Sequence, residues 1–155
     1  MTVQTTLQLG TETSTVLCIE NGHVVLQQEL RLGTASLARQ WMRHTPPTQL
    51  DIEHAIEQTE DVVMPLAAKL VRTEHLLLSG TGAELIRQGV GAASDEVRNW
   101  NLDEVEDLFN RLAMVSQGRP AGQEALPTAP EFYAAIVIVR ECLHHLRFSE
   151  VVVLS

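Results

Sequence analysis

Basic residues are scarce in this sequence of 155 residues, which has 11 Lys and Arg against 20 Asp and Glu and a formal charge of -9. Proteins bind nucleic acids and anionic membranes through basic patches that neutralise phosphate groups. The charge balance therefore argues against nucleic acid and against a membrane surface as partners.

Cysteines and long apolar runs are also few. Cys18 and Cys142 lie far apart in apolar stretches, which is typical of buried reduced thiols rather than of a disulfide framework. The N-terminal region has no basic stretch followed by an apolar one, and no run approaches the ~18 apolar residues of a membrane span. We therefore expect a cytoplasmic location and no membrane segment.

Apolar residues are nevertheless plentiful enough for a core. They make up 45% of the sequence, and a chain of this length buries a core without disulfide or metal staples. We predict a single domain over residues 1–155.

The clearest local signal lies in residues 2–32, which predict three short strands in antiparallel pairs. Asn21-Gly22 separates two apolar runs, and a type I′ turn needs φ > 0 at both central positions, which Asn and Gly tolerate best. The sequence therefore predicts a hairpin at this point. The earlier turn, residues 10–14, places small hydroxyl residues after a glycine, so its N–H groups face either an anion or water.

Apolar residues that recur every three or four positions predict helices over 35–43 and 50–72, and Pro65 is expected to interrupt the second. Asn101, with Glu104 three residues later, forms a capping box that starts another helix. The run 132–146 suits a strand by its Ile and Val content. Its length and its helical spacing favour a helix.

Two continuous apolar runs, 74–78 and 151–154, predict buried parallel strands. The fold class is therefore α/β, with a five-stranded mixed sheet of order 3-2-1-4-5, an antiparallel meander followed by parallel strands, and helices on both faces. The loops at 10–14 and 79–82 would then meet at the carboxyl edge of the sheet, where backbone N–H groups can hold phosphate. The candidate phosphate-binding residues are Gly10, Thr11, Thr13, Ser14, Ser79, Gly80, Thr81 and Gly82.

Several stretches resemble one family in their order and spacing. They are 26–37 (LQQELRLGTASL), 61–70 (DVVMPLAAKL), 78–85 (LSGTGAEL), 101–112 (NLDEVEDLFNRL) and 135–155. The chain resembles the second half of the catalytic core of the exopolyphosphatase and guanosine pentaphosphate phosphatase (Ppx/GppA) family. The resemblance implies the ribonuclease H-like fold of the actin-like ATPases, and an activity on polyphosphate or pppGpp.

The chain departs from the family where the chemistry depends on it. Residues 8–15 are QLGTETST where the family has DIGGGSTE. Gln8 replaces an acidic residue that would help to hold a divalent metal and a water, and Glu12 adds a negative charge to the loop expected to receive phosphate. The resemblance places the family's catalytic glutamate in a segment before Gln8 that this chain lacks. We therefore expect no catalytic residue, no metal and no cofactor, with magnesium only if a first domain completes the site.

Three hypotheses for the function follow. The first is a degenerate or excised phosphatase half, not catalytic alone, that binds phosphate or nucleotide weakly. The second is an active polyphosphate or pppGpp hydrolase half completed by a missing first domain. The third is an interaction module that forms a homodimer or docks a partner through its uncovered flank.

A second group of residues has the spacing of a metal site. Glu141 and His144 have the E-x-x-H spacing of di-iron helix bundles, and His145 follows them. That motif needs ligands from other helices, and the sequence reveals none. A solvated helix end is the favoured interpretation.

Overall fold

The computed structural model describes residues 2–91 and 98–154. The strands are β1 (Val3–Gln8), β2 (Ser14–Glu20), β3 (His23–Leu30), β4 (His75–Ser79), β5 (Arg98–Asn101) and β6 (Glu150–Val153). The helices are α1 (Thr34–Trp41), α2 (Gln49–Val63), α3 (Thr81–Gly89), α4 (Leu102–Ser116) and α5 (Pro130–His145), with short 3₁₀ segments at Met64–Ala68 and Ala121–Gln123. No helix among the described residues has the length and apolar character needed to cross a membrane.

The strands form one mixed sheet of order β3-β2-β1-β4-β6-β5. β1, β2 and β3 make an antiparallel meander, β4 pairs in parallel with both β1 and β6, and β5 is antiparallel to β6. The α/β class and the order of the five expected strands are confirmed, but the predicted total of five strands is wrong. The missed strand, β5, has only four residues and a polar sequence, RNWN, so it carries neither the alternation nor the β-branched residues of a strand.

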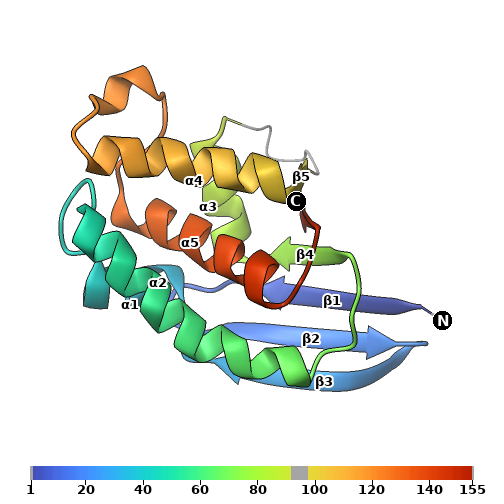
Figure 1. The fold of residues 1–155 in the computed structure, drawn as a ribbon. Helices are drawn as coiled ribbons and strands as arrows, with labels where there is room; N and C mark the ends of the chain where they lie inside the picture. Colours follow the sequence, from blue (N-terminus) through green and yellow to red (C-terminus); the bar gives the residue numbers. More distant parts are fainter. Residues whose placement is uncertain (1, 92–97, 155) are drawn as a thin grey trace.

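The prediction of helices on both faces is also wrong, because the helices form one layer. α5 contacts α1, α2, α3 and α4, and Figure 1 shows α2, α4 and α5 together in front of the sheet. The crossovers from β3 to β4 and from β4 to β6 run in the same direction across the sheet. Right-handed crossovers in one direction place their helices on one face.

The burial of the strands agrees with a single helical layer. In β1, Thr5 and Leu7 are buried whereas Gln4 and Gln8 are exposed. On the face without helices, Leu17, Leu77 and Val152 are half-buried and form a row across the sheet with Thr6. This face therefore has an apolar centre without a helical cover.

A turn, a helix end and a helix cap that depend on local backbone conformation were predicted correctly from the sequence. Asn21 and Gly22 have φ of 51° and 82°, as the hairpin requires. α2 ends at Val63, and the 3₁₀ segment with Pro65 follows it. The side chain of Asn101 accepts a hydrogen bond from the Glu104 N–H at 2.9 Å, which confirms the capping box of α4.

Helix α5 is the centre of the core. Its residues from Phe132 to Val139 are all buried, because other helices surround it and the sheet lies beneath it. The choice of helix for this Ile- and Val-rich run is confirmed. Cys18 and Cys142 are both buried free thiols, as predicted.

Candidate functional site

The two loops expected to bind phosphate lie side by side at the carboxyl edge of the sheet. The parallel register pairs Gln8 with Ser79 at the ends of β1 and β4. Beyond this pair, the Leu9 N–H donates to the Ser79 carbonyl at 2.9 Å and the Gly82 N–H donates to the Leu9 carbonyl at 2.8 Å. The predicted meeting of the two loops is confirmed as a matter of geometry.

The loops share a cavity of about 230 Å³, which we call the loop cavity. Its lining residues are Gln8, Leu9, Gly10, Thr13, Ser14, Thr15, Gly80 and Thr81. Five of the predicted phosphate-binding residues therefore line it: Gly10, Thr13, Ser14, Gly80 and Thr81. Thr11, Ser79 and Gly82 do not line it. Phosphate binding by any of the eight residues stays a prediction.

Close backbone contact explains the glycines of the second loop. Gly80 has φ of +89°, and a Cβ there would lie 2.9 Å from the Leu9 carbonyl oxygen. A Cβ on Gly82 would lie 2.2 Å from Cγ of the Leu9 side chain. Only glycine allows β1 and the start of α3 to approach this closely.

The first loop uses its carbonyl groups to cap α1. The Thr34 N–H donates to the Gly10 carbonyl at 3.0 Å, and the Ala35 and Ser36 N–H groups donate to the Thr11 carbonyl at 2.9 and 3.1 Å. These N-terminal donors of α1 are therefore satisfied within the protein.

Other backbone donors at the loop cavity are still available. The Gly10 N–H donates to Ser14 Oγ, which in turn donates to the Leu32 carbonyl at 2.6 Å. In the described part of the chain, the Thr13 and Thr81 N–H groups have no hydrogen-bond acceptor. Among the described residues the Gly80 N–H has none either, so an anion in the loop cavity would rely on these groups and on hydroxyls.

Glu12 lies outside the loop cavity. Its carboxylate accepts two hydrogen bonds from Arg39 of α1, at 2.8 and 3.1 Å, and both side chains are exposed. The hydrogen bond from Arg39 holds the pKa of Glu12 below its ordinary value. Glu12 lines a separate groove with Arg31. The structure therefore does not support the expectation that its carboxylate repels phosphate from the loop cavity.

A larger cavity, of about 460 Å³, lies elsewhere, between β5 and α4. Asp103, Glu104 and Asp107 line it together with Arg111, whose guanidinium pairs with Glu124. Carboxylates repel an anion, so the smaller loop cavity suits phosphate better despite its size.

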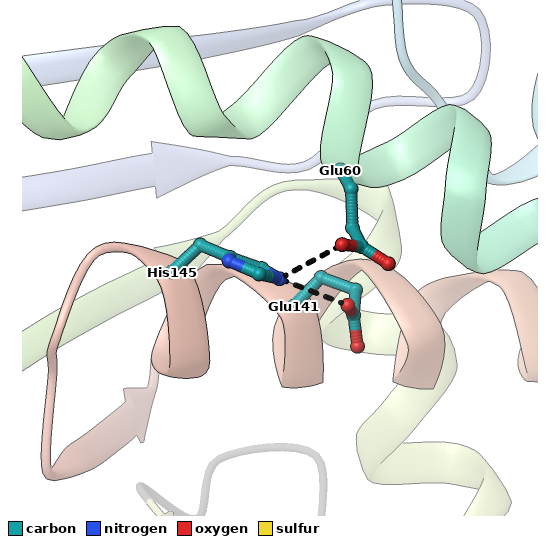
Figure 2. Close-up of side chains that lie close together, drawn as sticks. All are labelled: Glu60, Glu141 and His145. Atoms are coloured by element: carbon teal, nitrogen blue, oxygen red, sulfur yellow. Dashed lines mark ion pairs between the residues drawn. The ribbon is translucent and has the colours of Figure 1, made fainter.

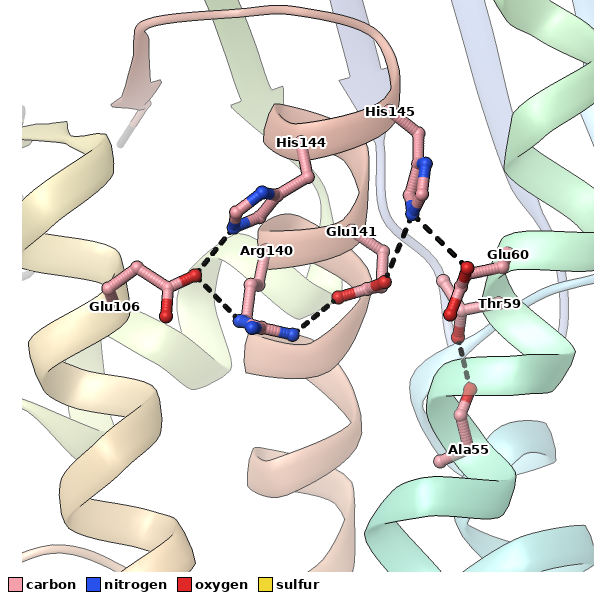
Figure 3. A network of polar contacts seen from close by, with 8 residues as sticks. All are labelled: Ala55, Thr59, Glu60, Glu106, Arg140, Glu141, His144 and His145. Carbon is pink, nitrogen blue, oxygen red and sulfur yellow. Dashed lines mark hydrogen bonds and ion pairs between the residues drawn. The ribbon is translucent and has the colours of Figure 1, made fainter.

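Charged residues of α2, α4 and α5 gather at the end of the helical layer away from the loop cavity, and Figure 3 shows their contacts. Arg140 bridges Glu106 of α4 and Glu141 of its own helix, with both N–O distances 2.8 Å. His144 Nε2 lies 2.5 Å from Glu106, whereas His145 faces Glu141 and Glu60 of α2. The favoured interpretation, a solvated helix end, is therefore wrong for Glu141, whose side chain is buried. Glu141 is placed with His145 rather than His144, and the residue from another helix that the sequence did not reveal is Glu60.

Two carboxylates of this group have pKa values shifted in opposite directions. Burial raises the pKa of Glu141, and Arg140 acts in the opposite direction. Burial also acts to raise the pKa of Glu106, but hydrogen bonds from His144 and Arg140 outweigh it, and the pKa is lowered. The guanidinium of Arg140 also lies 4.2 Å above the ring of Phe109, which fixes its position between the two carboxylates.

No family model and no curated protein sequence matches the chain. Solved structures do. A Ppx/GppA phosphatase from Aquifex aeolicus, in its type II variant, superposes with a TM-score of 0.77 at 12% identity over 99% of this chain and 53% of its own. An exopolyphosphatase from Cytophaga hutchinsonii superposes with a TM-score of 0.66 at 16% identity, again over 99% and 53%.

The chain has the fold of half a Ppx/GppA protein. It spans about half the length of these solved structures, which agrees with the predicted half-protein domain. The resemblance drawn from the sequence is thus confirmed for the fold. The low identity fits a chain in which motifs such as residues 8–15 have diverged.

Proposed function

We propose that the chain is a second-half domain of Ppx/GppA type that binds phosphate or a nucleotide phosphate weakly and does not hydrolyse phosphoanhydrides alone. The observation that carries the proposal is the loop cavity, where Thr13 and Thr81 offer free N–H groups between two adjacent loops. Backbone N–H groups and hydroxyls at the end of a parallel strand are a common way to bind phosphate.

The same cavity supports the absence of hydrolysis. Hydrolysis of a phosphoanhydride needs a positioned water, a base, and a metal or cationic clamp for the charge on the phosphoryl oxygens. The lining residues are all uncharged, and Gln8 stands where the resemblance expects a carboxylate. Magnesium prefers carboxylate and phosphate oxygens, so this set of neutral donors does not fit the ion unless another domain adds a carboxylate.

A charge placed in the loop cavity tests the binding. NMR titration of the wild type with tripolyphosphate is expected to shift the amide signals of Thr13 and Thr81. Thr13→Glu is expected to weaken this binding by about tenfold or more, because the added charge faces the anion. Gln4→Glu is the control, since it adds the same charge at an exposed position of β1 outside the cavity. Equal binding by all three proteins would contradict the proposed site.

The missing carboxylate gives a test of catalysis. We expect no release of inorganic phosphate from polyphosphate with magnesium, by the wild type or by Gln8→Asp. Phosphate release by the wild type without any added domain, well above the buffer background, would favour a working hydrolase. Release only after a first-half domain is added would favour the second hypothesis, an active half that needs completion.

A second candidate function rests on the sheet face without helices. Leu17, Leu77 and Val152 form an apolar row there, which suits a homodimer or a first-half domain as a cover. Sedimentation is expected to detect self-association that Leu77→Lys weakens and Met114→Lys, an exposed position on α4, does not. A monomer at high concentration would contradict the homodimer.

A further inference from the structure

Three possible ligand atoms converge between α2 and α5, far from the loop cavity (Figure 2). Glu60, Glu141 and His145, which we call the two-helix cluster, each offer one atom, and these atoms lie within 4.8 Å of one another. β6 follows α5 and runs parallel to β1, so the end of α5 lies at the edge of the sheet opposite the loops. The cluster therefore belongs to a different region from the site proposed above.

The distances in the cluster suit a metal better than hydrogen bonds. His145 Nε2 lies 3.3 Å from Glu141 Oε1 and 3.4 Å from Glu60 Oε2. Charge-assisted hydrogen bonds between such groups are shorter, about 2.7–2.9 Å, and one imidazole nitrogen carries at most one proton for two acceptors. In a tetrahedral zinc site with bonds of about 2.0–2.1 Å, neighbouring ligand atoms lie roughly 3.3–3.4 Å apart.

The electrostatic balance also suits a cation. Glu60, Glu106 and Glu141 supply negative charge, and Arg140 is the one guanidinium that bridges two of them. The group thus has three carboxylates and one guanidinium, and a divalent ion would offset the excess negative charge. The Glu141 side chain is 4% exposed, and the Arg140 guanidinium that offsets its charge contacts Oε2, whereas Oε1 faces the cluster.

The surroundings supply the other parts of a metal site. Arg140 donates to Glu141 Oε2 at 2.8 Å and leaves Oε1 to face His145, so it orients the carboxylate as outer-shell partners do. His145 also lines a cavity of about 370 Å³, so its imidazole is open to solvent on one side.

We propose that Glu60, Glu141 and His145 form a binding site for a divalent transition-metal ion of the zinc class. A histidine with two carboxylates suits zinc or a neighbouring first-row metal better than magnesium or calcium, which prefer oxygen ligands alone. The site joins the end of α2 to the end of α5.

Cobalt is the probe, because Co²⁺ in a tetrahedral site has intense visible absorption bands. Wild-type protein treated with chelator and then titrated with Co²⁺ is expected to develop these bands, and Zn²⁺ is expected to displace the cobalt. Calorimetry with Zn²⁺ alone is expected to give one site per chain, with no competition from an equal concentration of Mg²⁺.

Two ligand variants and a control assign the site. His145→Ala and Glu60→Gln are expected to weaken Zn²⁺ binding by more than the roughly 10- to 100-fold that loss of an outer-shell partner costs. His144→Ala, a neighbour on the same helix that faces Glu106 instead, is expected to bind zinc within about threefold of the wild type, since a surface contact contributes little. Glu60 is a third exposed, so its variant is expected to fold even if Glu141→Gln does not.

Either of two results would overturn the proposal. One is the absence of cobalt bands and of zinc binding in the wild type. The other is unchanged zinc binding in both His145→Ala and Glu60→Gln, which would assign the ion to other residues, such as the cysteines.

Discussion

The loop cavity and the two-helix cluster lie at opposite ends of one fold and are built from different chemical groups. At the loop cavity, backbone groups and glycines pack so closely that a Cβ would collide, and the lining is uncharged. At the cluster, long charged side chains from α2 and α5, with α4 beside them, meet between helices. The first region should therefore be sensitive to added atoms, and the second to removed charges.

The largest effect is expected from a methyl group at the loop end. In Gly33→Ala the new Cβ would lie 2.3 Å from the Thr11 carbonyl oxygen, an atom of the backbone that cannot turn aside. We expect a loss of about 3 kcal/mol in the free energy of unfolding, measured by urea denaturation. Gly122→Ala is the control, because the space around its new methyl group is open to 4 Å, and its stability should match the wild type. A stable Gly33→Ala would mean that the first loop moves away easily.

A lost charge at the cluster end is expected to cost somewhat less. Arg140→Met leaves the buried carboxylate of Glu141 without its cation, at an expected cost of about 2 kcal/mol. The double variant Arg140→Met/Glu141→Met removes the stranded carboxylate as well and should recover part of that loss. A double variant less stable than Arg140→Met would contradict this, since Glu141 would then stabilise the fold through other contacts, such as that with His145.

A smaller, pH-dependent effect is expected at the start of α2. Burial acts to raise the pKa of Asp51, but the Thr48 N–H at 3.0 Å and His44 at 2.8 Å outweigh it, so the pKa is lowered. A carboxylate with a lowered pKa stabilises the folded state above its ordinary pKa of 3.8, and this contribution is lost as the pH falls through the lowered value. Asp51→Asn should therefore cost about 1 kcal/mol at pH 7 and almost nothing in strong acid. A constant difference from pH 7 to pH 2 would contradict this assignment.

The smallest effect is expected at the exposed pair of Glu12 and Arg39. Exposed ion pairs contribute little because water screens them. Glu12→Gln should leave the melting temperature and the tripolyphosphate affinity unchanged, since Glu12 lies outside the loop cavity. Tighter binding by Glu12→Gln would restore the original expectation that this carboxylate repels phosphate.

The sequence was a good guide to features that neighbouring residues decide. Asn21-Gly22 and the cap at Asn101 depend on local backbone conformation, and both were predicted correctly. The meeting of the two loops followed from the strand order alone. β5 was missed because a polar edge strand is recognised by its partner, β6, rather than by its own residues.

The two-helix cluster needed the packed structure. The spacing of Glu141 and His145 places them on one helical face, but Glu60 lies on α2, far away in the sequence. Nothing in the neighbourhood of Glu60 distinguishes it from the other acidic residues of that helix. The single helical layer could have been inferred, because both crossovers run in the same direction across the predicted sheet.

The central position of α5 has a consequence for how the chain folds during synthesis. The meander of β1, β2 and β3 has short-range pairings and is synthesised before α5, yet its buried face belongs to a core that α5 completes. α5 and β6 occupy the last part of the described chain, and β6 pairs with β4, more than seventy residues earlier. Such long-range pairing forms slowly, so the nascent meander keeps an apolar surface exposed until α5 and β6 have been synthesised. A chaperone that binds nascent chains would find its target in the strands of this meander.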